Sequence, residues 1–259
     1  MERPSVPFDV LPVKGDLEAE VVDGIVLSIG QKLGRGDSRA RCAALEQLID
    51  ADQEALAELA PTLVQALEDS HRRVRRLARL VLTKLDSDTL GEHAHHLVSK
   101  LESRDSAVRW AALEVLLHLK PAKLAACASV LVAKLEDSSK GVRQAAVEAL
   151  SRLDATTLGG VSNDIVQKFQ HEGSGTRRAA LELLIKLQHD DLMLHVDAIV
   201  PLLEDEGVGV RWRALEALAR LQPGVLEPHA AGIAARLADG DERVRGAARE
   251  LVARLSETS

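Results

Sequence analysis

The sequence repeats itself every 34 residues, and this period constrains the fold more than any other feature. Arginine recurs at this spacing seven times, with no insertion or deletion between the copies. We call these residues the Arg column: Arg41, Arg75, Arg109, Arg143, Arg177, Arg211 and Arg245. Three residues after each arginine stands an alanine, and seven residues after it a leucine or valine. A fixed period of this length indicates a stack of similar supersecondary units.

Each copy contains two helical patterns with a short polar turn between them. In copy three, Leu90, Leu97 and Leu101 lie on one helical face, and Val108 and Leu116 follow on a second. Only 2% of the residues are aromatic, so leucine, valine, isoleucine and alanine must fill the core, which favours helices over a β-sandwich. Each copy is therefore predicted to be a helical hairpin.

Several residues mark the expected ends of helices. Asp37, Asp105 and Asp241 share one column and are suitable N-caps for the second helix of their copies. Pro121 and Pro223 share another column, at the start of first helices, where a missing N–H costs little.

Residues 17–256 carry the repeat, and residues 1–16 do not. Residues 1–16 contain Pro4, Pro7 and Pro12 without a helical stripe, so we expect an extended arm. They also lack the apolar run of a signal peptide. Two cysteines, Cys42 and Cys127, do not make a disulfide framework. We expect an intracellular, cytoplasmic protein that is monomeric by itself and does not insert into a membrane.

The repeat signature resembles that of HEAT repeats. Residues 131–153 (LVAKLEDSSKGVRQAAVEALSRL) show it whole, and it is similar to the short repeats of phycobilin-lyase-like proteins. Tetratricopeptide repeats have a similar period, but their Trp-Leu-Gly-Tyr pattern is missing and the chain has no tyrosine. The resemblance implies an all-α fold, a right-handed α-solenoid of seven hairpins, that is, a HEAT-like or armadillo-like superhelix.

The resemblance also implies a structural ladder between copies, formed by the Arg column and a column of aspartates. The Asp column consists of Asp69, Asp137, Asp205 and Asp239. Copy five departs from the pattern, with His171 in the Asp column and Thr176 in place of valine, which puts a continuous ladder in doubt there. A nucleic-acid role for the arginines is the alternative. We favour the structural role, because a cation in the first turn of a helix needs a compensating partner.

Glutamates occupy a further column five residues after the arginines, and in four copies a cation follows four residues later. We expect i,i+4 ion pairs such as Glu148–Arg152, Glu182–Lys186 and others on a solvated face.

Departures from the repeat mark a candidate partner site. Leu80 interrupts the Glu column, and arginines and both tryptophans occupy the column directly after the Arg column. Exposed tryptophan and arginine are typical of binding anchors, although the rings could instead lie flat on neighbouring repeats. The expected partner-binding residues are Arg76, Leu80, Lys84, Trp110, Arg178 and Trp212.

These observations predict a non-enzymatic scaffold or adaptor that binds a protein partner through its second helices, which line the concave face in HEAT proteins. The net charge of −7 disfavours nucleic acid as the partner. The alternatives are a subunit of a phycobilin-lyase-like enzyme, a HEAT-like DNA glycosylase, or a nucleic-acid-binding solenoid. We predict no catalytic residue, cofactor or metal. His93 and His96 have the i,i+3 spacing of metal ligands, but no acid or cysteine cluster accompanies them.

Overall fold

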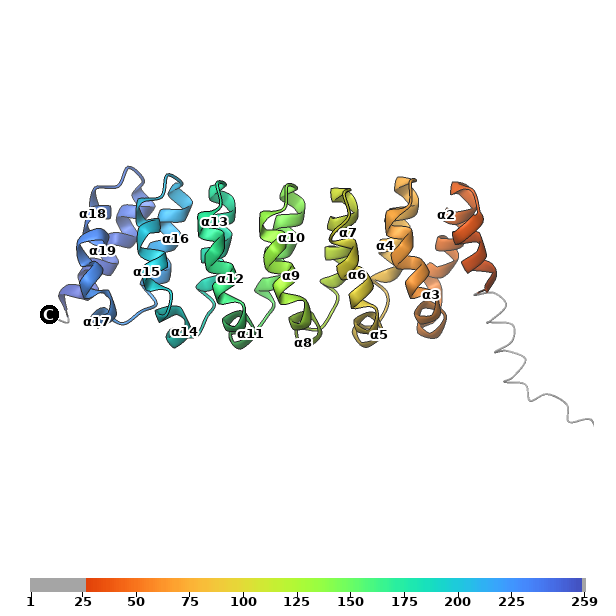
Figure 1. Cartoon of the computed structure of the whole chain (residues 1–259), viewed down its shortest axis with the longest axis horizontal. Helices are drawn as coiled ribbons and strands as arrows, with labels where there is room; N and C mark the ends of the chain where they lie inside the picture. The colour runs from red at the N-terminus through yellow and green to blue at the C-terminus, as the bar shows by residue number, and fades with distance from the viewer. Residues whose placement is uncertain (1–26, 258–259) are drawn as a thin grey trace, which may run out of the picture. The chain divides into compact units, whose positions relative to one another are not determined.

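The computed structural model describes residues 27–257, which form two units. Unit 1 ends at His96 and unit 2 begins at Leu97, so the boundary falls within α6 (Ala94–Lys100). The described residues contain helices and turns and no strand, which confirms the all-α prediction (Figure 1). The predicted arm, residues 1–16, and the start of the first hairpin lie outside the described residues.

Unit 1 contains the end of the first hairpin and the whole of the second. Residues 27–35 are helical and precede the labelled elements. These elements are α2 (Ser38–Gln47), η1 (Leu48–Asp50), α3 (Gln53–Gln65), η2 (Ala66–Glu68), α4 (Arg72–Leu82) and α5 (Ser87–Glu92). The second helices of the two copies, α2 and α4, pack against each other, and α3 packs against α4.

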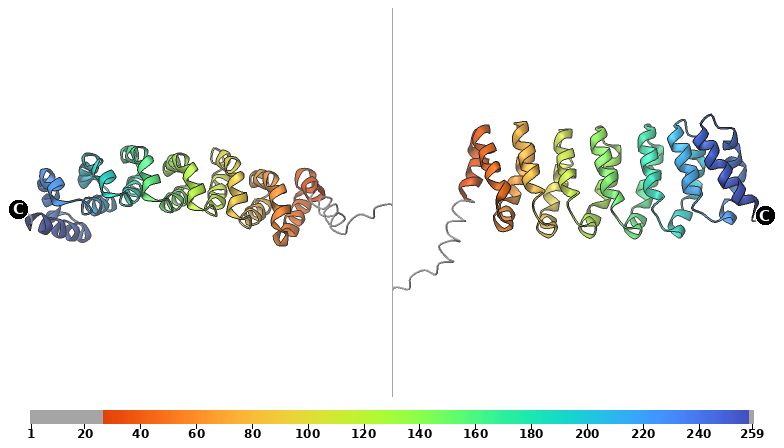
Figure 2. Two further views of the ribbon diagram at one scale, coloured as in Figure 1. Left: turned by 90° about the horizontal axis from the view of Figure 1, so that it is seen from below. Right: turned by 180° about the vertical axis from the view of Figure 1, so that it is seen from behind.

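Unit 2 contains five second helices, which pack in order, each on the next (Figure 2). These helices are α7 (Ser106–Leu116), α10 (Lys140–Ser151), α13 (Ser174–Leu184), α16 (Val208–Leu218) and α19 (Glu242–Ser256).

The first helices of copies three to seven are divided, where one continuous helix was predicted. The pieces are α5 and α6; α8 (Pro121–Leu124), η3 (Ala125–Cys127), α9 (Ala128–Ala133) and η4 (Lys134–Glu136); α11 (Ala155–Gly160), α12 (Ser162–Gln167) and η5 (Lys168–Gln170); α14 (His189–Met193), α15 (Val196–Ile199) and η6 (Val200–Glu204); α17 (Pro223–Leu226), η7 (Glu227–His229), α18 (Ala230–Ala235) and η8 (Arg236–Ala238). Each division falls in the same column: His93, Cys127, Val161, His195 and His229.

The backbone explains this difference from the prediction. Val161, for example, has φ −114° and ψ 9°, which lies outside the α-helical region and starts a new helical segment. In copy two the same column holds Leu59, which lies inside the continuous helix α3. The division is thus a property of the later copies and not of the period itself.

The repeating apolar columns form the core, as predicted. Alanines three residues after the Arg column, such as Ala112, Ala146 and Ala180, are fully buried. Leucines such as Leu116 and Leu150 are equally buried, each contributing about 1.5–3 kcal/mol of hydrophobic stabilisation. Since every copy buries the same columns, the copies within each unit stack with their second helices side by side and leave one face of those helices exposed.

The predicted helix ends are confirmed. The side chain of Asp37 accepts a hydrogen bond from the N–H of Ala40, and Asp105 and Asp241 cap α7 and α19 in the same way. Pro121 and Pro223 begin α8 and α17. These caps fix where the second helices begin, and therefore where the Arg column lies relative to the turn.

Candidate partner-binding face and the ion pairs between repeats

The Arg column pairs with the Asp column of the following copy. Arg109 donates from Nε to Asp137 Oδ2 at 2.6 Å and from Nη2 to Oδ1 at 2.7 Å. Arg177–Asp205 and Arg211–Asp239 have the same two-bond geometry. In unit 1, Arg41 pairs with Asp69. The predicted ladder therefore exists wherever an aspartate is present in its column.

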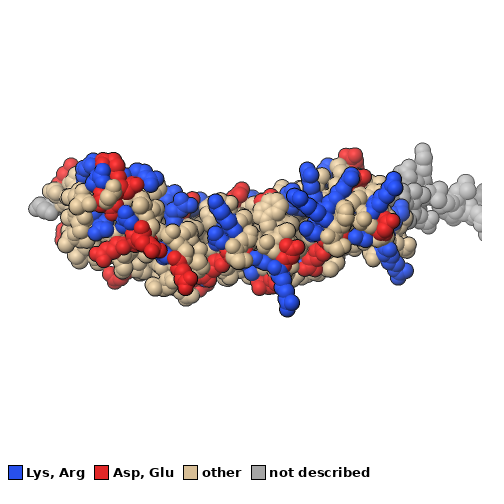
Figure 3. All heavy atoms as spheres, turned by 90° about the horizontal axis from the view of Figure 1, so that it is seen from above, with Lys and Arg blue, Asp and Glu red and all other residues tan. Residues whose placement is uncertain are grey.

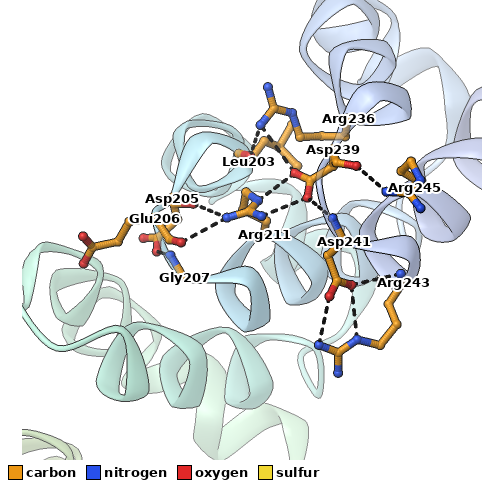
Figure 4. Close-up of polar contacts among 10 residues, drawn as sticks. All are labelled: Leu203, Asp205, Glu206, Gly207, Arg211, Arg236, Asp239, Asp241, Arg243 and Arg245. Carbon is orange, nitrogen blue, oxygen red and sulfur yellow. Dashed lines mark hydrogen bonds and ion pairs between the residues drawn. The ribbon is translucent and has the colours of Figure 1, made fainter.

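Each pair is also tied to the backbone of the turns on either side. Nη1 of Arg211 donates to the carbonyls of Asp205 and Glu206 in its own turn, at 2.8 and 3.1 Å. Asp239 accepts the N–H of Asp241 at 3.0 Å through Oδ1 (Figure 4). The arginine thus holds its own turn and the next one together, which explains why it recurs in the first turn of a helix.

The pairing shifts the titration of both partners. Burial by itself would raise the pKa of Asp137, but hydrogen bonds from Arg109 and from the N–H of Ser139 outweigh it and hold that pKa below its ordinary value. The hydrogen bond from Arg211 is the largest cause of the lowered pKa of Asp239. The pKa of Arg109 is raised, chiefly by its hydrogen bond to Asp137. Both partners are therefore charged at neutral pH.

Within unit 2, the ladder is interrupted after copy four. Arg143 donates from Nη1 to the carbonyls of Asp137 and Ser138, as the other arginines do to their own turns. His171 stands where the aspartate would be, and its Nδ1 accepts the N–H of Gly173 at 2.9 Å. Within residues 27–257 no carboxylate pairs with Arg143. The expected break in the ladder at copy five is therefore confirmed. Arg143 is half-exposed, whereas Arg109 and Arg177 are buried.

The cations at the ends of the second helices contact backbone rather than glutamate, so the expected i,i+4 pairs are wrong in these copies. Arg152 donates to the carbonyl of Leu119 at 2.8 Å, and Lys186 to that of Ser151 at 2.8 Å. Both carbonyls belong to the end of the preceding copy's second helix or to the turn after it, where backbone acceptors lack intrahelical partners and attract cations.

In unit 1, the predicted partner residues lie on or just after α4. Arg76 and Leu80 are exposed, and 43% of Leu80 is accessible. Lys84 is exposed as well, but α4 ends at Leu82, so Lys84 lies in the following turn and not on the same helix face. Figure 3 shows Lys and Arg side chains gathered over α2 and α4. Arg73 on this surface pairs with Glu46 at 2.5 Å.

In unit 2, the structure places both tryptophans against neighbouring groups and leaves Trp110 more exposed. Trp110 is 37% accessible, and a Cβ at Gly141 of the next copy would lie 3.5 Å from its Cδ1 atom. Trp212 is half-buried, with the guanidinium of Arg213 4.6 Å from its ring centre. Arg178 is exposed. Trp110 thus covers a neighbouring repeat and still presents a third of its surface.

Two hollows between the second helices were not predicted from sequence. A cavity of about 250 Å³ lies between α10 and α13, and one of about 240 Å³ between α13 and α16. Gly175 and Arg178 line both. The signal in the sequence is a pair of glycines, Gly175 and Gly209, in the first turns of two consecutive second helices.

The remaining candidate residues are the histidines and the two cysteines. The ring centres of His93 and His96 are 6.2 Å apart. Residues 27–257 contain no group of three or more His, Cys, Asp or Glu side chains that could hold a metal ion. Cys42 and Cys127 are buried, and burial raises the pKa of the Cys127 thiol. In the described part of the chain, no helix has the length and apolar character needed to cross a membrane.

The fold and the ladder define a class of protein, the all-α solenoids built from HEAT-like repeats. Residues 94–158 match the family model for HEAT repeats, which confirms the resemblance seen in the sequence. No curated protein matches the chain.

Solved structures agree on the fold. The crystal structure of an archaeal HEAT-like repeats protein from Thermococcus onnurineus NA1 is similar, with 18% identity, a TM-score of 0.55, and coverage of 96% of this chain and 99% of that one. An engineered protein is also similar, at 19% identity and a TM-score of 0.56, over 93% of this chain and 71% of its own. At this identity the likeness shows the fold alone.

Proposed function

We propose that the protein is a non-enzymatic scaffold that holds a protein partner on the exposed face of its second helices. The observation that carries the proposal is a difference in contacts and exposure between two adjacent columns. Most residues of the Arg column form ion pairs between repeats. The column after it, by contrast, is exposed at Arg76, Trp110 and Arg178. Exposed side chains of this size and type are suited to anchor a partner.

The chemistry of this face suits a protein better than an apolar ligand. In unit 2 it presents the partly exposed indole of Trp110 and the guanidinium group of Arg178. In unit 1 it presents the exposed side chains of Leu80 and Arg76. Aromatic and arginine side chains are the residue types enriched where proteins bind one another. We further propose that the protein works inside the cell, because both cysteines are buried thiols without a disulfide.

The test is capture of partners from an extract of the source organism by the immobilised full chain, with quantitative mass spectrometry. Trp110→Ala should lower the recovery of specific partners at least tenfold, the loss expected for an anchor. Lys123→Ala is the control, because Lys123 is exposed on a first helix, α8, and not on the second helices. Equal recovery by the wild-type chain and Trp110→Ala, with both folded, would contradict the proposed face.

A further inference from the structure

The junction between copies four and five departs from the repeat at two positions that come together in space. His171 replaces the aspartate that would pair with Arg143, and Thr176 replaces the buried valine of the next turn. Thr176 is buried, and its hydroxyl donates to the carbonyl of Leu135 at 3.1 Å. The cavity between α10 and α13 is lined by Leu135, Arg143 and Thr176, so both departures border it.

His171 still accepts the N–H of its turn, as the aspartates do, but it does not pair with the arginine of the preceding copy. Its Nδ1 accepts the N–H of Gly173, as Oδ1 of Asp205 accepts the N–H of Gly207. A neutral ring whose Nδ1 is an acceptor carries its proton on Nε2, so it has no second acceptor for a guanidinium. The turn is therefore preserved, while the Nε and Nη2 edge of Arg143 lacks the carboxylate that Arg109, Arg177 and Arg211 bind.

The surroundings of this edge are basic. Lys140, Arg143 and Arg178 line the cavity, and Glu182 is its one acidic lining residue among those the structure describes. Gly175 leaves open space beside this edge, because a Cβ added there would meet no atom within 4 Å. A planar carboxylate is the group that contacts the same guanidinium edge of Arg109, Arg177 and Arg211, at 2.6–2.8 Å. We call the five residues Lys140, Arg143, Gly175, Arg178 and Glu182 the Arg143 site.

We propose that the Arg143 site binds a carboxylate side chain from an acidic segment of the partner protein, which completes in trans the ion pair that copy five omits. This inference rests on the proposed scaffold function and gives the partner's chemistry. The bidentate geometry of the other pairs favours aspartate or glutamate over a single-point acceptor. The neighbouring cations, Lys140 and Arg178, favour further acidic residues beside it.

The test uses the full chain and a fluorescein-labelled decapeptide rich in aspartate, with its asparagine counterpart as the control probe. Fluorescence anisotropy should show binding of the aspartate peptide and at least tenfold weaker binding of the asparagine peptide. His171→Asp introduces the residue that stands in this column as Asp137, Asp205 and Asp239. Its carboxylate should fill the site from within and weaken binding of the aspartate peptide at least tenfold. Arg143→Gln should have the same effect on binding.

Thermal unfolding distinguishes a variant whose site is filled from a variant whose fold is damaged. His171→Asp should raise the Tm, since it adds an internal ion pair, even though it abolishes peptide binding. A loss of binding together with a higher Tm is the signature of a filled site and cannot come from misfolding. Undiminished binding by His171→Asp, or equal binding of both peptides, would overturn the proposal. So would a single-stranded oligonucleotide that binds the wild-type chain more tightly than the peptide and loses this affinity in His171→Asp.

The same variants separate this inference from the scaffold proposal. If partner capture survives in His171→Asp and is lost in Trp110→Ala, the scaffold function holds and the Arg143 site is wrong. If capture is lost in neither variant, the exposed face of the second helices is not where the partner binds.

Discussion

Arg109 and Asp137 are 28 residues apart in the sequence, and their side chains meet through two hydrogen bonds of 2.6 and 2.7 Å. The pair is largely shielded from water, with 11% of the arginine side chain and 6% of the aspartate side chain accessible. It joins consecutive repeats at one point of the turn, while apolar columns join them along the helices. The polar contact therefore sets the register in which one copy stacks on the next.

Removing one partner of this pair should be costly. Arg109→Ala leaves Asp137 as a shielded carboxylate without its cation, and we expect a loss of about 3 kcal/mol in the free energy of unfolding. Arg143→Ala is the matched control in the same column, since it breaks only hydrogen bonds to carbonyls, and it should cost about 1 kcal/mol. Urea titration measures both. Equal losses would show that the ion pair adds nothing to the backbone contacts.

Acid should weaken the ladder. The pKa of Asp205 is lowered, because the hydrogen bonds from Arg177 and the N–H of Gly207 outweigh the effect of burial. A lowered pKa in the folded state contributes stability above the ordinary aspartate value of about 3.9. That stability is lost as the pH falls below this value, because the unfolded chain binds protons first. We expect the Tm of the wild-type chain to drop steeply below pH 4. Asp205→Asn should have a lower Tm at pH 6, but its Tm should fall less on acidification. An unchanged slope in the variant would contradict this.

His195 should add a second pH dependence nearer neutrality. Burial lowers its pKa, and the nearby charge of Asp191 offsets part of that effect. The folded state therefore favours the neutral ring, and its stability should decline as the pH falls through the ordinary histidine value of about 6.5. His195→Val, which introduces the residue that copy five carries as Val161, should reduce the drop in Tm between pH 7.5 and 5.5. Identical drops in the two proteins would exclude His195 as the cause.

Two glycines should respond in opposite ways to alanine. Gly141 lies in the first turn of α10 without a positive φ, and an added Cβ would meet Trp110 at an ordinary contact distance of 3.5 Å. Gly141→Ala should stabilise the fold by about 0.5–1 kcal/mol. Gly36→Ala should destabilise it, since its Cβ would lie 2.9 Å from the Cβ of Ala40 and closer still to the carbonyl oxygen of Lys32. Chemical unfolding of both variants tests the contrast.

Much of the fold was predictable because the information is local and repeated. Helical spacing identified the buried columns, Asp105 was correctly assigned as an N-cap, and the Arg and Asp columns correctly indicated their pairing. The exposure of Arg76 and Trp110 was predicted because their column shares a helical face with the Glu column. In each case a residue's surroundings depend on its position in the period, so seven copies of the pattern are enough to identify it.

The sequence by itself determined the repeat, its core and the residues of the ladder, and only the tertiary structure decided which acceptor each long side chain reaches. Arg152 was expected to bind Glu148 one turn away, but stacking brings the carbonyl of Leu119, 33 residues earlier, within 2.8 Å. No glycine or proline shared by the later copies marks the division of their first helices at Val161 and its equivalents. Helical periodicity reports which face is buried, whereas long-range contacts form only once neighbouring repeats have packed and their unpaired backbone groups lie within reach.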